Sequence, residues 1–416
     1  MKKLKIAAPL IALLLVLTGC RSLLTEINNY LYEDTYDPAK YATEYRNNWQ
    51  YQQLGTEFQD YYGSMYTAVM DTANMASQLD FTNENGETES IAGVRIRFLD
   101  GRMKDTDTEL LFEAFFRDNP QFFYVDREYR IEGQKGRDGV TYYDTIILQY
   151  LMPSELRAAA IRTFDAAIDD MLDGVPDGDD QYETQLSLYD RLAKHCTYDT
   201  VAAENMDDDS DPMAYTAYGA VVDGSAVCEG YAKAMQLLLN RCDIPATTVR
   251  GDAIDSDVSH MWNLVTINGN HYYFDPTWSD NGDKGTHAYF NITTEVLNRT
   301  HKIDEKNLGL PNCTATEDNY FVRNGTYIDF YERKKIAGVI ADKILDGDTC
   351  IQLQFSPKTF DNGLLFVRNV DLIFDMVDEH LEPHGKSLWD FALTTDKESY
   401  ILTIEKSEEK GLQQLL

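Results

Sequence analysis

The sequence predicts an α+β protein in which a central domain lies between two smaller α/β domains. The chain has 416 residues, which at roughly 150 residues per domain allows two or three domains with cores of their own. A segment with helical spacing begins at Cys228, and two strand patterns that end at Asp275 follow it. The composition changes again after Asn312, where short strand patterns flank one helical pattern.

The composition is that of a globular protein, and its charge excludes one class of partner. Hydrophobic residues make up 43% of the chain and charged residues 26%, so disorder along the whole chain is not expected. Asp and Glu total 70 against 37 Lys and Arg, which gives a formal net charge of −33. Such a surface repels phosphate backbones, so we expect no nucleic-acid partner. Six cysteines in this length do not indicate a disulfide scaffold.

Residues 1–20 predict a targeting segment rather than part of the fold. Three lysines in the first five residues precede the apolar run Ile6–Leu17, which is shorter than the roughly 20 residues needed to span a bilayer. The run ends in Leu17-Thr18-Gly19-Cys20, which resembles the lipobox of bacterial lipoproteins. We therefore expect lipidation of Cys20 and an extracytoplasmic protein anchored to the membrane at the bacterial cell surface. An ordinary secretory signal with a chance cysteine is the alternative.

The N-terminal part predicts a tether followed by a small α/β domain. Residues 21–50 are polar and Tyr-rich, and they predict a tether that leads into a helix. Apolar residues between Leu54 and Leu79 recur at steps of three and four, which predicts a long amphipathic helix. The rest of the domain at residues 51–152 predicts a helix and two paired strands, at Thr106–Arg117, Phe122–Ile131 and Thr141–Tyr150.

The central domain is expected at residues 153–312 and the C-terminal α/β domain at residues 313–416. Before the Cys228 segment, the central domain predicts helices at Pro153–Leu172 and Tyr182–Lys194. The acidic loop between these helices lacks the glycine and glutamate spacing of a calcium-binding loop. The C-terminal domain predicts one helix and three strands, at Arg333–Leu345, Tyr327–Tyr331, Thr349–Phe355 and Tyr400–Ile404.

Cys228 is the candidate nucleophile. Apolar residues follow it at helical spacing up to Cys242, so Cys228 is expected in the first turn of a buried helix. The free amides and dipole at a helix N-terminus favour the thiolate form of a cysteine, and the thiolate is the reactive form.

A hairpin downstream supplies a candidate histidine and a candidate carboxylate. The strand patterns His260–Ile267 and His271–Asp275 are joined by Asn268-Gly269, a strong signal for a two-residue turn. In that register Ile267 faces Asn270, and His260 becomes a diagonal neighbour of Asp275 on the same sheet face. Asp275 can then fix the imidazole tautomer while the other ring nitrogen pairs with the thiol.

Three motifs in this order resemble the transglutaminase-like superfamily, which has a papain-like cysteine fold. They are AVCEGYAKAMQLLL, HMWNLVTING and HYYFDPTWSD, at Ala226–Leu239, His260–Gly269 and His271–Asp280. The resemblance implies a helix that carries the cysteine, packed on an antiparallel sheet, with Cys228, His260 and Asp275 as the catalytic triad. It also implies a thioester intermediate and an oxyanion donor at the Cys228 amide, with an upstream side chain, Tyr218 or Tyr215, as a second candidate donor.

These expectations favour a surface-anchored cysteine amidohydrolase or peptidase that acts on peptide or isopeptide bonds. The partner is then a peptide or protein substrate, with cell-wall peptide favoured by the expected location. A cross-linking protein-glutamine acyltransferase and a non-catalytic peptide or cell-wall binding module are the alternatives. The other cysteines of the domains, Cys196, Cys242, Cys313 and Cys350, lack metal-ligand spacing and are expected to be structural or paired. No phosphate loop, dinucleotide fingerprint or HExxH motif is present, so neither cofactor nor metal is expected.

Overall fold

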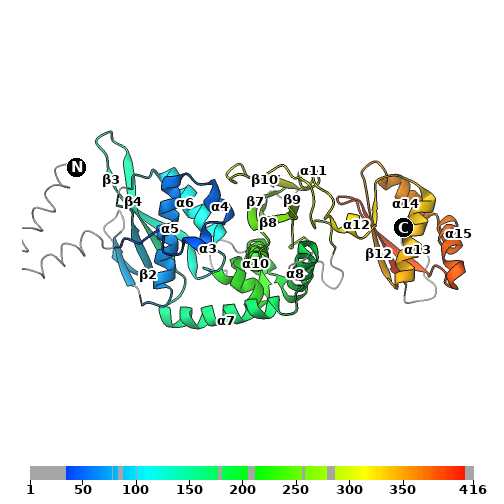
Figure 1. The fold of residues 1–416 in the computed structure, drawn as a ribbon, viewed down its shortest axis with the longest axis horizontal. Helices are drawn as coiled ribbons and strands as arrows, with labels where there is room; N and C mark the ends of the chain where they lie inside the picture. The colour runs from blue at the N-terminus through cyan, green and yellow to red at the C-terminus, as the bar shows by residue number, and fades with distance from the viewer. Residues whose placement is uncertain are drawn as a thin grey trace, which may run out of the picture. The chain divides into compact units, whose positions relative to one another are not determined.

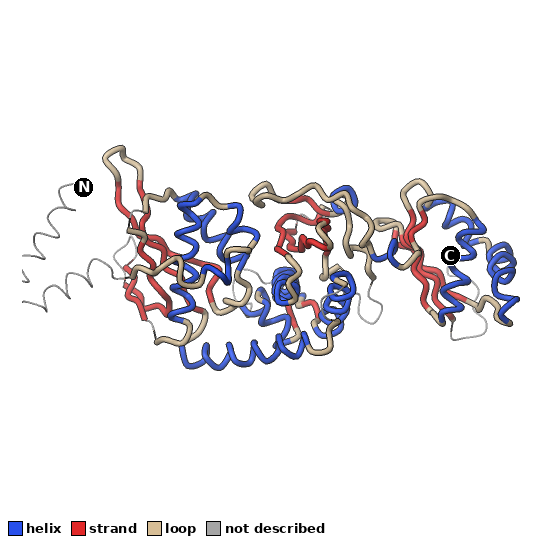
Figure 2. Tube along the Cα trace, in the orientation of Figure 1, coloured by secondary structure: helices blue, strands red, loops and turns tan. Residues whose placement is uncertain are grey.

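The computed structural model describes residues 34–76, 78–82, 88–99, 101–176, 180–204, 211–254, 258–278 and 286–407. The predicted signal peptide and Cys20 lie outside the described residues. The chain divides between Ala166 and Ala167 into two compact units, and each is described here by itself (Figures 1 and 2). Among the described helices, none combines the length and the apolar character that crossing a bilayer requires. The domain limits drawn from the sequence stay predictions.

The first unit contains a four-stranded sheet in the order β1-β2-β4-β3, packed with helices α5 and α6 (Figure 1). The strands are β1 (Gln78–Thr82), β2 (Thr88–Arg97), β3 (Val125–Lys135) and β4 (Thr141–Tyr150), and the helices are α5 (Thr56–Thr72) and α6 (Asp105–Asp118). The division between the units falls within α7 (Ser154–Leu172). The predicted helix at Thr106–Arg117 and the antiparallel pairing of β3 with β4 are confirmed.

Helix α5 is shorter than its apolar pattern predicts. It ends at Thr72, and Leu79 lies in β1, where it pairs with Ile91 of β2. The guanidinium of the buried Arg157 donates to the carbonyl oxygens of Thr72, Ala73 and Met75. These bonds satisfy carbonyls that the helix end leaves without a helical partner, so the chain can leave the helix there.

Part of the segment predicted as a tether packs on this unit. From Asp34 onward the chain forms two short helices, α3 (Ala42–Tyr45) and α4 (Trp49–Gln53). The side chains of Tyr45 and Gln50 are buried, and the backbone N–H of Gln50 donates to the buried carboxylate of Asp118.

The second unit contains the sheet that carries the site, with strand order β10-β7-β8-β9. Helix α10 packs on β7 and β8 with α8 beside it (Figure 1). The elements are α8 (Gln181–His195), α10 (Cys228–Arg241), β7 (Ala246–Ala253), β8 (Val258–Ile267), β9 (Asn270–Phe274) and β10 (His301–Ile303). The expected α+β class, with the cysteine helix on an antiparallel sheet, is confirmed.

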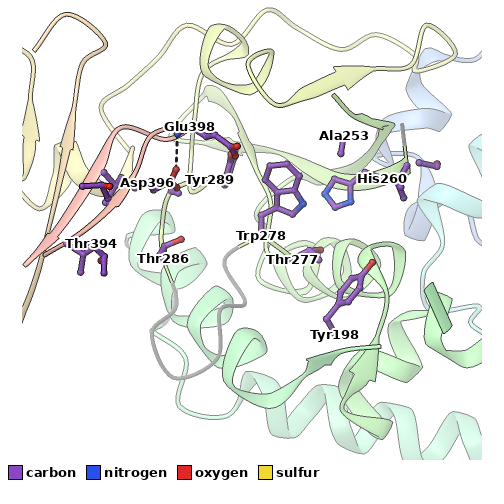
Figure 3. Close-up of a pocket in the computed structure, with 16 residues that line it drawn as sticks. Tyr198, Ala253, His260, Thr277, Trp278, Thr286, Tyr289, Thr394, Asp396 and Glu398 are labelled. Carbon is purple, nitrogen blue, oxygen red and sulfur yellow. Dashed lines mark hydrogen bonds between the residues drawn. The ribbon is translucent and has the colours of Figure 1, made fainter. Parts of the chain in front are cut away.

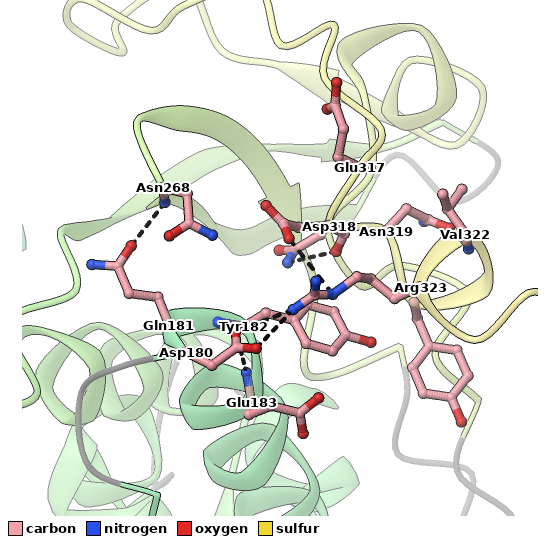
Figure 4. Close-up of polar contacts among 12 residues, drawn as sticks. Asp180, Gln181, Tyr182, Glu183, Asn268, Glu317, Asp318, Asn319, Val322 and Arg323 are labelled. Carbon is pink, nitrogen blue, oxygen red and sulfur yellow. Dashed lines mark hydrogen bonds and ion pairs between the residues drawn. The ribbon is translucent and has the colours of Figure 1, made fainter.

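The predicted hairpin register is confirmed. Ile267 pairs with Asn270, and the ladder continues to Asn263 opposite Phe274. Both turn residues have positive φ, +50° at Asn268 and +83° at Gly269, which is the conformation of a type I′ turn. The turn is also held from outside, because the backbone N–H of Asn268 donates to the side-chain carbonyl of Gln181 at the start of α8 (Figure 4).

A charged contact ties a later segment to the same helix start. The Asp180 carboxylate caps α8 by accepting from the backbone amides of Tyr182 and Glu183. The same carboxylate pairs with the Arg323 guanidinium at 3.0 Å (Figure 4). The chain after β10 therefore returns to α8, next to the hairpin turn.

The C-terminal part of this unit forms a second sheet, in the order β11-β12-β14-β13, with its own apolar core. Its elements are β11 (Tyr327–Ile328), α13 (Arg333–Asp346), β12 (Cys350–Phe355), α14 (Phe360–Arg368), α15 (Val370–Leu381), β13 (Phe391–Asp396) and β14 (Ile401–Lys406). The sequence patterns did not predict α14, α15 or β13. Strand β13 pairs with β14 and alternates half-buried and exposed positions.

Candidate active site

The nucleophile candidate lies where a short strand changes into a buried helix. Cys228 is the first residue of α10, directly after the extended residue Val227. The two residues before Val227 form β6 (Ser225–Ala226), which pairs in parallel with β5 (Thr197–Tyr198). Since the body of α10 is buried, these contacts fix the half-buried Cys228 side chain at the helix N-terminus.

His260 and Asp275 meet as the hairpin register predicts. His260 is the third residue of β8, and Asp275 directly follows β9. The Nε2 atom of His260 lies 2.6 Å from the Oδ2 atom of Asp275. The Cys228 side chain lies close enough to His260 to raise the pKa of its imidazole. Because Nε2 is occupied by Asp275, Nδ1 is the ring nitrogen left for the thiol.

Asp275 is completely enclosed and its carboxylate is fully used as an acceptor. Its Oδ1 atom accepts from the backbone amides of Thr277 at 2.8 Å and Trp278 at 3.3 Å. Its Oδ2 atom accepts from His260 and, at 3.2 Å, from Nε2 of His301. Burial by itself raises the pKa of Asp275, but the two histidines lower it well below its usual range.

The same partners hold His260 in its charged form. Burial by itself lowers the pKa of this imidazole, but the neighbouring Asp275 carboxylate and Cys228 thiolate raise it to about 10. The imidazolium is therefore favoured near neutral pH whenever the thiol has given up its proton. This is the charge state that a reactive cysteine–histidine pair needs.

His301 belongs to this cluster, and sequence reasoning missed it. It is 1% exposed and opens β10, whose partner strand β7 in turn pairs with β8. No spacing rule links it to Asp275, because a three-residue strand gives no periodic pattern. The nitrogen and oxygen atoms of His260, Asp275 and His301 lie within 4.8 Å of one another, so they could bind a metal ion. However, the 2.6 Å separation of His260 and Asp275 is that of a hydrogen bond, and it is shorter than the roughly 3.3 Å between ligands of a tetrahedral zinc.

A pocket of about 750 Å³ opens beside His260 (Figure 3). Its wall includes Tyr198, Trp278 and Tyr289 from the central part, and Asp396 and Glu398 from the C-terminal part of the same unit. Trp278 stands between His260 and the two acidic residues in Figure 3. A substrate in this pocket would contact the His260 imidazole on one side. On the other side it would contact a wall of aromatic and acidic side chains.

The expected second oxyanion donors do not gain support from the geometry, while a third tyrosine does. The Tyr215 hydroxyl donates to the carbonyl oxygen of Ala202 at 2.8 Å, so its proton is already used. Tyr218 precedes the π-helical turn Gly219–Asp223 and does not line the pocket. Tyr198 lines the pocket, and burial together with the charges of Cys228 and Asp275 raises its pKa to about 12. Its strand partner Ala226 lies two residues before Cys228, so Tyr198 is held at the nucleophile.

The other cysteines are separate from this cluster. The five cysteines of the described residues form no disulfide. Cys196 and Cys313 are buried, Cys242 is half-buried, and Cys350 is exposed. Burial raises the pKa of the Cys313 thiol to about 12. The pairing that the sequence left open is therefore not found among these described cysteines, and their structural role stays a prediction.

A cysteine at a helix N-terminus, an imidazole and a buried carboxylate on adjacent strands define the class of sites that form thioesters by nucleophilic attack. Residues 171–276 match the family model described as the transglutaminase-like superfamily, and all three residues lie within that match. This part of the chain is therefore a transglutaminase-like domain, as the motifs implied. No curated protein matches the chain.

The solved structures that match this chain are distant from it in sequence and in structure. A transglutaminase described as "a TGase" is 16% identical, with a TM-score of 0.26, and the match covers 52% of this chain and 59% of that one. The periplasmic domain of TgpA from Pseudomonas aeruginosa is 14% identical, with a TM-score of 0.21, and the match covers 34% of this chain and 56% of that one. The chain thus spans less than two thirds of either protein.

Proposed function

We propose that this protein is a cysteine-dependent amidohydrolase or peptidase that cleaves peptide or isopeptide bonds. The observation that carries the proposal is the grouping of Cys228, His260 and Asp275. Cys228 acts on the His260 imidazole from a helix N-terminus, the imidazole is hydrogen-bonded to Asp275, and His260 lines a pocket large enough for a peptide segment. A buried structural cysteine needs neither an imidazole partner nor an open pocket. A binding module needs the pocket, but it does not need the charged pair.

The proposed reaction runs in two halves. The Cys228 thiolate attacks the amide carbonyl carbon, and the resulting oxyanion is held by the Cys228 amide and the Tyr198 hydroxyl. The His260 imidazolium gives its proton to the departing amine as the C–N bond breaks, which leaves a thioester and a neutral imidazole. Water then loses a proton to His260 and attacks the thioester, and the released thiolate and imidazolium restore the starting state. Asp275 stays ionised throughout and keeps the imidazole oriented.

A cross-linking acyltransferase is the second candidate, and the acidic wall of the pocket favours it. Asp396 and Glu398 would attract an amine that competes with water for the thioester. Hydrolysis remains the first proposal because water surrounds the site, and an amine wins only where it is bound and oriented. The Asp396 carboxylate already accepts hydrogen bonds from the backbone amides of Glu398 and Ser399, which reduces its capacity to hold an amine.

A partition experiment separates these outcomes. The protein is incubated with a peptide mixture, with and without a primary amine at millimolar concentration, and products and Cys228 adducts are identified by mass spectrometry. Hydrolysed peptide as the main product supports the hydrolase, and amide-linked product supports the transferase. In the transferase case, the double variant D396N/E398Q should lower the amide-linked share. A Cys228→Ser variant is the matched control. A reactive Cys228 that forms no acyl adduct with any peptide would contradict both and favour the binding module.

We also propose that the chain is a lipoprotein attached through Cys20 and that its substrate is a peptide outside the cytoplasm, such as cell-wall peptide. The support is the lipobox-like sequence at the end of a short apolar run. The proposal sets the location of the enzyme and does not alter its chemistry.

A further inference from the structure

His301 contacts the catalytic carboxylate but is not one of the three residues that the mechanism uses. Its Nε2 atom lies 3.2 Å from Oδ2 of Asp275, the same oxygen that receives His260. Aromatic rings enclose its imidazole, with ring-centroid distances of 4.5 Å to Trp278 and 4.8 Å to Trp262. A histidine held this tightly has one orientation, so its hydrogen bonds define its tautomer.

The hydrogen-bond partners of His301 determine where its proton lies. Its Nδ1 atom is 2.8 Å from the Thr300 hydroxyl. Asp275 can only accept, so Nε2 of His301 carries a proton and donates it to the carboxylate, while the Thr300 hydroxyl holds Nδ1. Thr300 and Asp275 therefore hold the two ring nitrogens of His301 from opposite sides.

We propose that His301, oriented by Thr300, is a positioning residue that holds Asp275 ionised and in place for His260. The inference rests on the proposed function, because it assigns His301 a role in that same site. The His301 N–H stabilises the Asp275 carboxylate on the same oxygen that receives His260. The titratable groups that face His301 are Asp275, His260 and Tyr289, and Asp396 and Glu398 act on Tyr289 from the C-terminal sheet.

The consequence is a dependence of Cys228 reactivity on pH. Without the His301 donor, the pKa of Asp275 rises and the carboxylate stabilises the His260 imidazolium less. Part of the thiolate–imidazolium pair then converts to the neutral thiol and imidazole, because the proton moves from the less stabilised imidazolium to the thiolate. At high pH the thiolate forms without the imidazolium, so the loss disappears. The acid side of the reactivity profile should therefore move to higher pH.

The test compares iodoacetamide labelling of Cys228 at pH 6 and pH 9 in the full chain, with the labelled site identified by mass spectrometry. We expect His301→Leu to lower the ratio of the two rates about tenfold, in line with one lost hydrogen bond to a charged group. His301→Gln should restore most of the ratio, because its amide can donate to Asp275 from the same position. Thr300→Val should lower the ratio by a smaller factor, because it removes the hydroxyl that holds Nδ1 and so orients the His301 ring. His271→Gln is the matched control, since His271 lies on β9 and hydrogen-bonds Thr266 instead.

The outcomes separate this inference from the proposed function. A merely structural role lowers the thermal midpoint of His301→Leu but leaves the rate ratio at the wild-type value, and that result would overturn the inference. If His301→Leu does not fold, an unchanged ratio in Thr300→Val would overturn it instead. A His260→Ala variant with the wild-type ratio would contradict the proposed catalytic pair itself. If the rate ratio falls strongly in His260→Ala but keeps its wild-type value in His301→Leu, the inference about His301 is wrong and the proposed function is still supported.

Discussion

At the scale of single residues, the cysteines of this protein differ in environment rather than in chemistry. Cys228 has a helix N-terminus and an imidazole partner, whereas Cys313 has neither and its thiol pKa is raised by burial. We expect iodoacetamide to label Cys228 faster than Cys196, Cys242, Cys313 or Cys350 near neutral pH. His260→Ala should remove most of the difference from the exposed Cys350. Equal labelling rates at all five cysteines, measured by peptide mass spectrometry, would contradict an activated Cys228 and favour a structural role for it.

Tyr198 supports a second prediction at this scale. If its hydroxyl donates to the oxyanion, Tyr198→Phe should slow acylation of Cys228 by p-nitrophenyl acetate about tenfold or more. Alkylation by iodoacetamide forms no oxyanion, so its rate should stay the same. The matched control is Tyr215→Phe, because the Tyr215 hydroxyl donates to Ala202. Equal losses in acylation and alkylation would mean that Tyr198 only shapes the site.

The charge of His260 predicts how stability depends on pH. Its pKa is raised from 6.5 to about 10 in the folded chain, so the folded state binds more protons between these values. The stability that His260 contributes is fully present below pH 6.5, and it is lost as pH rises through about 10. Urea unfolding at pH 6, 8 and 10 should show this decline in the wild type and a flatter profile in His260→Gln. Parallel profiles for the two proteins would contradict the assignment.

At the scale of elements, β10 reaches the site only because β7 offers it a residue without a side chain. A Cβ atom at Gly251 would press on the carbonyl oxygen of Lys302 and on the Trp262 ring. Lys302 directly follows His301, so any shift of β10 moves the imidazole away from Asp275.

Gly251→Ala should therefore cost about 1–3 kcal/mol of unfolding free energy. It should also lower the ratio of Cys228 labelling at pH 6 to that at pH 9, as expected for His301→Leu. Gly338→Ala is the control, because its added Cβ would meet only His380, at an ordinary 3.7 Å. If Gly251→Ala lowers the unfolding free energy but keeps the wild-type ratio of Cys228 labelling, a shift of β10 does not alter the contact between His301 and Asp275.

At the scale of the whole molecule, the proposed lipid anchor predicts where the protein is found. Wild-type protein expressed in bacteria should partition with membranes, with a mature N-terminus at Cys20 that carries lipid. Cys20→Ala should be unprocessed or released, because no other side chain of the motif can form the thioether. N-terminal mass spectrometry and membrane fractionation check this. A mature N-terminus at another residue, without lipid, would contradict the proposal, and the catalytic site would be unaffected.

The sequence by itself determined the parts of this protein that depend on local spacing. Helical spacing after Cys228 placed the thiol at a helix start, and Asn268-Gly269 determined the register that brings His260 to Asp275, because a two-residue turn leaves one pairing. Tertiary structure alone decided the rest. His301 and Tyr198 lie on strands too short for a periodic pattern, and they reach the site through pairing with β7 and β6. The pocket wall at Asp396 and Glu398 joins residues more than a hundred positions from the triad. Such contacts arise from packing between distant segments, which leaves no trace in the local pattern of either one.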